Sequence, residues 1–380
     1  MKRLFLCILL AAVSTSLAWA QGEAGLAIVE DSLIITSVPL RSGSTVDLHA
    51  KIFENVNSTC QAGVGNTVLA IHGPLLTANS WRNYAYALLD NSQNMVWDGA
   101  TITGNICRFV ALDLPGHGRS SFPEGGNLMY GDLLLEDYVQ AIFAGMNRLR
   151  TIQVRPTILI GHSMGGLLVE MMQDTLIKQG RNQMGREYNL RSVYDIRNIV
   201  LLAPAPPGNF RWPTAEDPGG IAGWEQYINM DPQYGLYFLL NYPAWTGFLF
   251  LGMDGELAPS IPSATEAIQQ QYISPEPLSI FLEASNFGPL LRPSVAPGIF
   301  APNRGTKVYL VGYENDTLMA MVDHAGVYRH LTYDNTRSRY AVVGGPESVH
   351  GIHVGNAVLL LKRLEGQVDV PYVIGDDIEP

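Results

Sequence analysis

Residues 157–166 read TILIGHSMGG, and this stretch decides how the rest of the chain is interpreted. Four β-prone residues lead into a G-x-S-x-G turn, and the LLVEMM run at 167–172 is typical of a helix. A serine on a sharp strand-to-helix turn projects its hydroxyl beyond the strand, and the flanking glycines remove Cβ atoms that would collide there. This context makes Ser163 a candidate nucleophile.

Two further stretches belong to the same pattern. Residues 68–73 read VLAIHG, and residues 111–120 read ALDLPGHGRS. The three motifs, in this order and spacing, resemble the third strand, the fourth strand with its loop, and the nucleophile turn of the α/β-hydrolase superfamily. The resemblance implies a mostly parallel, eight-stranded α/β-hydrolase sheet flanked by helices, with a helical lid inserted after strand 6.

The resemblance also implies a domain organisation. It covers nearly all of the chain after the leader except residues 205–303, where this family carries a variable lid. We therefore expect residues 21–204 to form the first part of the hydrolase core and residues 304–380 the second part.

The residues themselves favour the same architecture. Two β-prone runs, 32–39 and 46–53, flank an R-S-G-S turn and predict an antiparallel hairpin. From residue 67 onward, strand patterns alternate with helical ones, which predicts a parallel sheet covered by helices on both faces.

The first twenty residues have the pattern of a secretory signal peptide. Lys2 and Arg3 precede an apolar run that starts at Leu4, and the A-x-A sequence ending at Ala20 is a cleavage pattern. The apolar run is about half of the roughly 20 residues that a membrane-spanning helix needs. We expect cleavage after Ala20 and a secreted or periplasmic protein without a stable membrane anchor.

The charge balance restricts the partners. The chain has 24 basic and 35 acidic residues and a formal net charge of -11, so it lacks the electrostatic footprint of a nucleic-acid-binding protein. No carboxylate or histidine cluster has metal-ligand spacing, and we expect no cofactor. The expected partner is a neutral, largely apolar small molecule, and the sequence does not indicate the oligomeric state.

A serine nucleophile needs a histidine base and a carboxylate that orients it. In the family that the chain resembles, both follow late strands, in the order serine, acid, histidine. Asp316 follows the strand pattern at 308–312 and is the expected acid, with Glu314 and Asp323 as alternatives. His350 lies 34 positions later, before a helix, and is the expected base.

His353 is the alternative base, only three positions further along. The histidines inside the three motifs, His72, His117 and His162, are expected to order loops by hydrogen bonding, as is Asp113.

Acyl transfer also needs N–H donors for the oxyanion. Met164, directly after the nucleophile, is the first expected donor. The resemblance places the second donor after His72-Gly73, but Pro74 stands there and has no N–H. The alternatives are the N–H of Leu75 or the side chain of Thr77, and we favour Leu75.

Two cysteines, Cys60 and Cys107, remain after removal of the leader. In the family that the chain resembles, they precede two strands that are parallel neighbours, which puts both at the end of the sheet away from the nucleophile. Export favours oxidised thiols, so we expect a Cys60–Cys107 disulfide.

The expected lid is rich in aromatic residues. They form either an apolar roof for an acyl or aromatic group or simply the core of a small cap. They are Trp224, Tyr227, Tyr234, Tyr237, Phe238, Tyr242, Trp245, Phe248 and Phe250.

These features together predict a secreted serine hydrolase that cleaves a carboxylic ester through an acyl-enzyme. A lactonase, amidase, carbon–carbon hydrolase or acyltransferase would use the same triad. A non-catalytic binding module that retains the fold is the alternative from another class, since fold does not imply function, and Pro74 is the feature in its favour.

Overall fold

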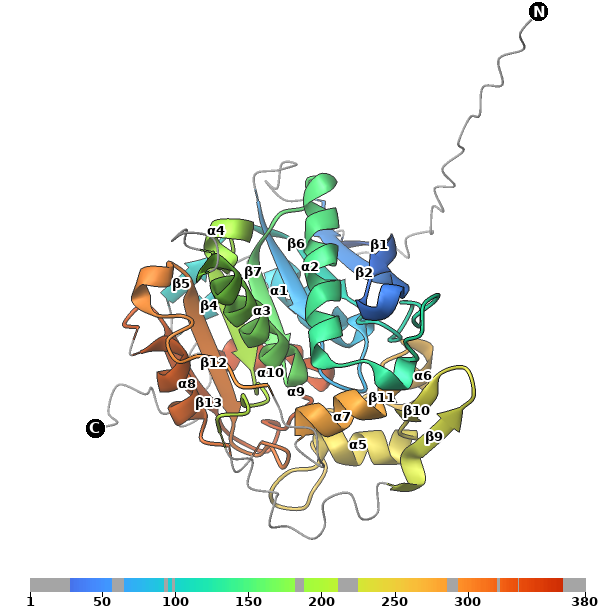
Figure 1. The fold of residues 1–380 in the computed structure, drawn as a ribbon. Helices are drawn as coiled ribbons and strands as arrows, with labels where there is room; N and C mark the ends of the chain where they lie inside the picture. Colours follow the sequence, from blue (N-terminus) through green and yellow to red (C-terminus); the bar gives the residue numbers. More distant parts are fainter. Residues whose placement is uncertain are drawn as a thin grey trace, which may run out of the picture.

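An eight-stranded, mostly parallel sheet forms the centre of the molecule (Figure 1). The computed structural model describes residues 28–56, 65–91, 95–97, 100–181, 188–210, 225–285, 293–319, 322–333 and 335–364. In spatial order the strands are β1 (Ile28–Pro39), β2 (Thr45–Asn55), β6 (Ile106–Leu112), β3 (Asn66–Ile71), β7 (Pro156–His162), β8 (Asn198–Leu202), β12 (Lys307–Tyr313) and β13 (Arg339–Val343). The predicted α/β fold, with an eight-stranded and mostly parallel sheet flanked by helices, is confirmed.

One strand of the sheet, β2, runs opposite to the other seven. β1 pairs antiparallel with β2 through the short helix η1 (Arg41–Gly43), as the opening hairpin predicts, and β2 pairs antiparallel with β6. From β6 to β13 every pairing is parallel. The carboxyl ends of six strands therefore meet at one edge of the sheet, where loops carry functional side chains in open α/β sheets.

Helices cover both faces of this sheet (Figure 1). On one face α2 (Leu135–Thr151) packs against α3 (Met164–Arg181), and α3 packs against α4 (Leu190–Tyr194). On the other face α1 (Arg82–Asn91) contacts α9 (Ile352–Gly355) and α10 (Ala357–Leu364). α8 (His324–Thr332) packs on β12, on the same face as α3, because the β7–α3–β8 and β12–α8–β13 crossovers run in the same direction along the sheet and share one handedness. Because both faces are covered, the central strands are apolar along their whole length rather than alternating.

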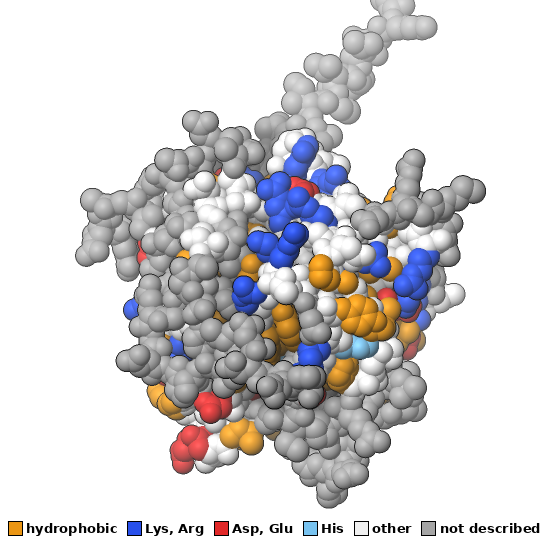
Figure 2. Space-filling model, turned by 90° about the vertical axis from the view of Figure 1, so that its left-hand side faces the viewer, with side chains coloured by type: hydrophobic (Ala, Val, Ile, Leu, Met, Phe, Trp, Pro, Cys, Tyr) orange, Lys and Arg blue, Asp and Glu red, His pale blue; other side chains and the backbone are white. Residues whose placement is uncertain are grey.

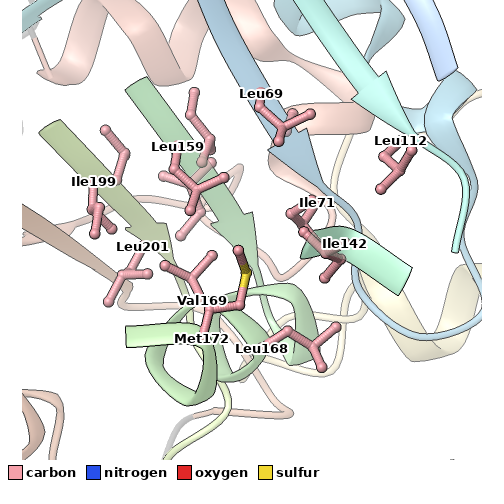
Figure 3. Close-up of a cluster of buried hydrophobic side chains, with 14 of the residues drawn as sticks. Leu69, Ile71, Leu112, Ile142, Leu159, Leu168, Val169, Met172, Ile199 and Leu201 are labelled. Carbon is pink, nitrogen blue, oxygen red and sulfur yellow. The ribbon is translucent and has the colours of Figure 1, made fainter. Parts of the chain in front are cut away.

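The main core lies between the sheet and helices α2 and α3. Figure 3 shows side chains of β3, β7 and β8 pointing toward those of α3. Leu69, Leu159 and Ile199 are fully buried in this layer. Truncating one such side chain to alanine costs about 2–5 kcal/mol, so this core holds the nucleophile turn on a rigid support.

The segment between β8 and β12, which we call the inserted segment (residues 205–303), lies beyond one end of the sheet (Figure 1). Its helices α5, α6 and α7 agree with the predicted helical character. It also contains a three-stranded sheet, β11-β10-β9, which the sequence did not predict. In order it comprises η5 (Glu225–Tyr227), β9 (Ile228–Asp231), β10 (Gly235–Phe238), α5 (Tyr242–Phe250), α6 (Ala264–Gln269), β11 (Glu276–Pro277) and α7 (Leu278–Ser285), and η6 (Pro302–Arg304) spans its C-terminal boundary.

The remaining elements are small. A hairpin of β4 (Met95–Trp97) and β5 (Ala100–Thr103) precedes β6, and the short helices η2 (Ala78–Trp81) and η3 (Tyr130–Asp132) lie in loops. The predicted leader, 1–20, lies outside the described residues, as does Cys60. Cys107 lies in β6 and is buried, and its disulfide with Cys60 stays a prediction.

Candidate active site

Ser163 occupies a strained turn between β7 and α3. Its φ is +54°, a left-handed conformation that is costly for a residue with a Cβ atom. The surrounding backbone holds it there, because the Ser163 N–H donates to Leu202 O at 2.9 Å and the Ser163 carbonyl accepts from the N–H groups of Gly166 and Ala205, each at 2.9 Å. The side chain is 3% exposed.

The two glycines that flank the serine are required by close approach of the backbone. A Cβ at Gly161 would lie 2.5 Å from the carbonyl oxygen of Gly165, and a Cβ at Gly165 would lie 2.6 Å from that of His72. These backbone atoms belong to a packed strand and helix and have little room to move. The G-x-S-x-G pattern is therefore a steric requirement of this turn.

Asp316 and His350 are brought together in the loops that follow β12 and β13. His350 Nδ1 donates to Asp316 Oδ2 at 2.7 Å, and both side chains are buried. Asp316 Oδ1 accepts the N–H groups of Leu318 and Met319 at 2.9 and 3.1 Å. With its proton on Nδ1, His350 has Nε2 free to accept one, and within the described residues this buried atom has no hydrogen-bond partner.

The alternative acids lie elsewhere. Glu314 is exposed and accepts the N–H of Gly345 at 3.2 Å. Asp323 caps α8 by accepting the N–H of Gly326 at 2.7 Å. Each carboxylate therefore supports a loop or a helix end.

The alternative base, His353, is held by ring packing. Its ring lies 4.7 Å from that of Trp81 and 4.0 Å from that of His162, measured between centroids. Burial, together with the nearby His350 and His72, lowers the pKa of His353 to about 3. Both of its ring nitrogens lack a partner within the described residues, so no carboxylate orients it.

The polar residues of the three motifs order loops, as expected. His72 Nε2 accepts the N–H of Leu114 at 3.1 Å, and His162 Nε2 donates to the His350 carbonyl at 2.9 Å. Asp113 accepts from His49 Nδ1 at 2.7 Å and from the Ala78 N–H at 2.6 Å. No group of metal-ligating side chains occurs within the part of the chain that the structure describes.

The oxyanion side of the site differs from the expectation for Leu75. Met164 begins α3, where helix N–H groups lack intrahelical acceptors. Leu75, however, donates its N–H to Glu276 Oε2 at 2.9 Å, and the Thr77 hydroxyl donates to Gln271 O at 2.7 Å. Both proposed replacements for the N–H missing at Pro74 are thus engaged by the inserted segment.

The inserted segment packs directly on the catalytic loops. Its buried side chains, among them Trp245 and Phe250, form one cluster with Leu75 and with Val349, the neighbour of His350. On the histidine side, the Gly351 N–H donates to Leu249 O at 2.7 Å. Phe238, Trp245 and Phe250 therefore form the core of the segment and at the same time cover the loops around Ser163. Trp224 lies outside the described residues.

The sequence does not predict the role of Glu276. Glu276 is fully buried in β11 and contacts both Leu75 and His117. The sequence around it, SPEPL, carries no catalytic motif or periodic signal, so nothing local marks this glutamate as a buried one.

Comparison with known proteins agrees with the fold. The model of the Alpha/beta hydrolase family matches residues 68–348, and the chain belongs to this family. A search of the curated proteins finds no match.

Similar solved structures include an esterase from Exiguobacterium antarcticum, which is 15% identical with a TM-score of 0.51 over 88% of this chain and 99% of that chain. A thioesterase domain from the curacin biosynthetic pathway is 17% identical, with a TM-score of 0.48 over 89% of this chain and 99% of that chain. A thermophilic esterase from Thermogutta terrifontis is 15% identical, with a TM-score of 0.48 over 88% of this chain and 97% of that chain. At these identities the likeness is one of fold.

Among the described residues, none of the helices has both the length and the apolar character needed to cross a membrane.

Proposed function

We propose that this chain is a serine hydrolase that cleaves a carboxylic ester through an acyl-enzyme. The observation that supports it most strongly is the buried 2.7 Å contact between His350 Nδ1 and Asp316 Oδ2, in a family whose nucleophile turn this chain carries at Ser163. A carboxylate on Nδ1 fixes the tautomer in which Nε2 acts as base.

The reaction then follows from these groups. Ser163 Oγ attacks the ester carbonyl while His350 Nε2 takes its proton, and the tetrahedral intermediate collapses as His350 returns that proton to the leaving alcohol. Water, activated by the same nitrogen, hydrolyses the acyl-enzyme. Asp316 stabilises the imidazolium that forms in each half-reaction, and the Met164 N–H donates to the oxyanion.

The inserted segment supports a neutral, largely apolar substrate. Leu75, Trp245 and Phe250 are buried in the cluster that covers the site, and the chain as a whole is acidic, with a net charge of -11. No cofactor enters the mechanism. We also propose that the protein is exported, because residues 1–20 have the pattern of a signal peptide.

The first test is hydrolysis of p-nitrophenyl esters from acetate to palmitate by the protein without its leader. We expect turnover that Ser163→Ala abolishes, and a fluorophosphonate probe should label the wild type at Ser163 and leave the variant unlabelled. His350→Ala should remove turnover, whereas His353→Ala should keep it. Turnover that survives Ser163→Ala would refute the proposal.

A non-catalytic binding module is the second candidate, and one observation favours it. Pro74 has no N–H, and the N–H of Leu75 is bonded to Glu276, so a second oxyanion donor is not evident near Ser163. Folded wild-type protein that neither turns over an ester nor reacts with the probe would support this candidate. Labelling without ester turnover would instead favour another bond, such as a lactone or an amide.

A further inference from the structure

Glu276 is a buried carboxylate that joins the inserted segment to the loop beside the nucleophile. It is 0% exposed. Its Oε2 accepts the Leu75 N–H at 2.9 Å and a bond from His117 Nε2 at 3.0 Å, while Oε1 accepts the Tyr138 hydroxyl at 3.2 Å. Within the described ranges its ion-pair partner is His117. A buried carboxylate is tolerated only with such compensation.

The partner histidine carries a positive charge. Besides Nε2 on Glu276, His117 has Nδ1 3.1 Å from the Pro115 carbonyl oxygen. Both ring nitrogens face oxygen acceptors, so both must donate, which only the imidazolium does. Burial, the largest single effect, lowers the pKa of His117, but Glu276, the Pro115 carbonyl and Asp113 together raise it above its ordinary value.

The loop that Glu276 holds is itself strained. Leu75 follows Pro74 and has φ +62°, a conformation that a leucine keeps only when its surroundings enforce it. The inserted segment forms two hydrogen bonds with this residue. The Leu75 N–H donates to Glu276, and the Ser274 N–H donates to Leu75 O at 3.1 Å.

A shift of this turn would reach the nucleophile. Gly73 starts this loop and lies close to the turn that carries Ser163. A Cβ built on Gly73 would lie 3.0 Å from Ser163 Cβ. Misplacing groups around a reacting centre by about 1 Å can cost on the order of 100-fold in rate.

We propose that Glu276 is a positioning residue for the reaction at Ser163, which fixes the Pro74–Leu75 turn and, as an ion pair with His117, keeps its own negative charge from opposing the oxyanion. The inference rests on the serine-hydrolase function proposed above. Glu276 forms no bond to substrate. It acts through the backbone of Leu75 and through the neutrality of its pair with His117.

This arrangement has a definite pH dependence. Because the pKa of His117 is raised, its positive charge persists to a higher pH than that of an ordinary histidine, and the ion pair is lost as the pH rises through that raised value. The other titratable groups near the pair are Asp113, His72, Tyr130 and Tyr138. Burial raises the pKa of both tyrosines and lowers that of His72 to about 3. As the pH rises above neutrality, His72 is already neutral and the tyrosines keep their protons, so His117 is the one of these four rings that changes charge first.

The test compares Glu276→Gln with Glu283→Gln. Glu283 is a matched control, because it is also a buried glutamate of the inserted segment and its Oε2 accepts a core N–H, that of Leu135, at 2.9 Å. That contact is with the start of α2 and not with the Pro74–Leu75 turn. Both variants, and the wild type, are assayed for kcat and KM with p-nitrophenyl esters between pH 5 and 10, and the His117 ring is titrated by NMR.

We expect Glu276→Gln to lower kcat about tenfold or more with KM changed by less than about twofold, because the turn and the charge balance are disturbed rather than the apolar pocket. The alkaline fall in kcat of the wild type should disappear, and His117 should titrate at a lower pH. Glu283→Gln should keep both the wild-type kcat and the alkaline fall.

Three outcomes would overturn the inference. Equal effects of the two substitutions would reduce Glu276 to a packing role. A higher kcat in Glu276→Gln would mean that the carboxylate blocks the Leu75 N–H instead of positioning it. An alkaline fall shared by wild type and Glu276→Gln would exclude the His117 pair as its cause. A wild type that neither turns over esters nor reacts with the probe refutes the serine hydrolase itself, a result that differs from all three.

Discussion

Asp316 divides its two carboxylate oxygens between two tasks. Oδ1 takes the backbone N–H groups of Leu318 and Met319, and Oδ2 takes the Nδ1 proton of His350. The first set of bonds fixes the carboxylate, which in turn fixes the plane and the tautomer of the imidazole. A group held in this way loses little entropy when His350 becomes charged during the reaction.

Replacing Asp316 with Asn should therefore damage the chemistry more than the fold. The amide can donate to Nδ1, which stabilises the wrong tautomer, and we expect kcat to fall by about 10⁴ with little change in KM. The assay is p-nitrophenyl ester hydrolysis, with circular dichroism as the check of folding. Glu314→Gln, at the exposed alternative acid, is the control and should keep its activity. Equal losses in the two variants would contradict the assignment.

The acid and the base could be nominated from the sequence because each follows a clear strand pattern. The choice of Asp316 over Glu314 and of His350 over His353 rests in the structure on a contact between loops 34 positions apart. Glu276 could not be found in this way. Its partners Leu75 and His117 lie 201 and 159 positions away, and no local pattern encodes such distant pairing.

The turn between β7 and α3 is tightly packed, and the sequence pattern does not reveal how tightly. Gly165 lies at the start of α3, where a Cβ would overlap the carbonyl oxygen of Ile71 and lie 2.6 Å from that of His72. Gly247, in α5, has open space around its Cβ position. The two glycines lie in helices, yet only the first is a requirement of packing.

Gly165→Ala should destabilise the protein by about 1–3 kcal/mol, since the added methyl group forces α3 away from β3. It should also lower ester turnover, because the turn that carries Ser163 moves with the helix. Gly247→Ala should leave stability unchanged or raise it by up to about 1 kcal/mol, the helix-propensity difference. Chemical denaturation of both variants measures this. A tolerated alanine at position 165 would contradict the close approach.

The elements themselves were predictable to different degrees. The parallel strands and the opening hairpin could be predicted because uninterrupted apolar runs and a polar turn encode them directly. The three-stranded sheet of the inserted segment could not, because β9, β10 and β11 are two to four residues long and short apolar runs do not distinguish strand from helix.

The predicted disulfide would link the segment that precedes β3 to the start of β6. Cys107 lies near the start of β6, and its Sγ lies against the backbone of Gly65, five positions after Cys60. We expect iodoacetamide to modify neither cysteine in unfolded, unreduced protein and both after reduction. Reduction should cost about 4 kcal/mol of stability, from loop-closure entropy. Alkylation of both thiols before reduction would exclude the bond.

Net charge describes the molecule as a whole but not each of its faces. The chain has a net charge of -11, yet the face drawn in Figure 2 carries a group of Lys and Arg side chains beside hydrophobic ones. On this side the sheet ends at β13, whose Arg339 is exposed. A charged side chain on an edge strand discourages pairing with another chain, so the exposed Arg339 protects this edge of the sheet.

Several buried histidines make the stability of the whole molecule depend on pH. Burial, the main cause, lowers the pKa of His72 and of His353 to about 3 and that of His324 to about 4. In the unfolded chain each would titrate near 6.5. Between those values the unfolded state binds more protons than the folded state, so the free energy of unfolding rises with pH and falls on acidification.

The free energy of unfolding should therefore decline as the pH is lowered from about 6.5 toward 4. His353→Leu should remove the part of that decline that His353 causes. Above pH 7 His353 is neutral in both the folded and the unfolded state, so its titration does not affect the free energy of unfolding. At pH 4.5 it is protonated only in the unfolded state, which lowers the free energy of unfolding by on the order of 2 kcal/mol. Urea unfolding at pH 7.5 and pH 4.5 measures the difference for wild type and variant. Val354→Ala, which truncates a fully buried neighbour, is the control, because it should lower stability by about the same amount at both pH values. Parallel stability curves for wild type and His353→Leu would mean that His353 is solvated or paired in the folded protein, contrary to its packing between Trp81 and His162.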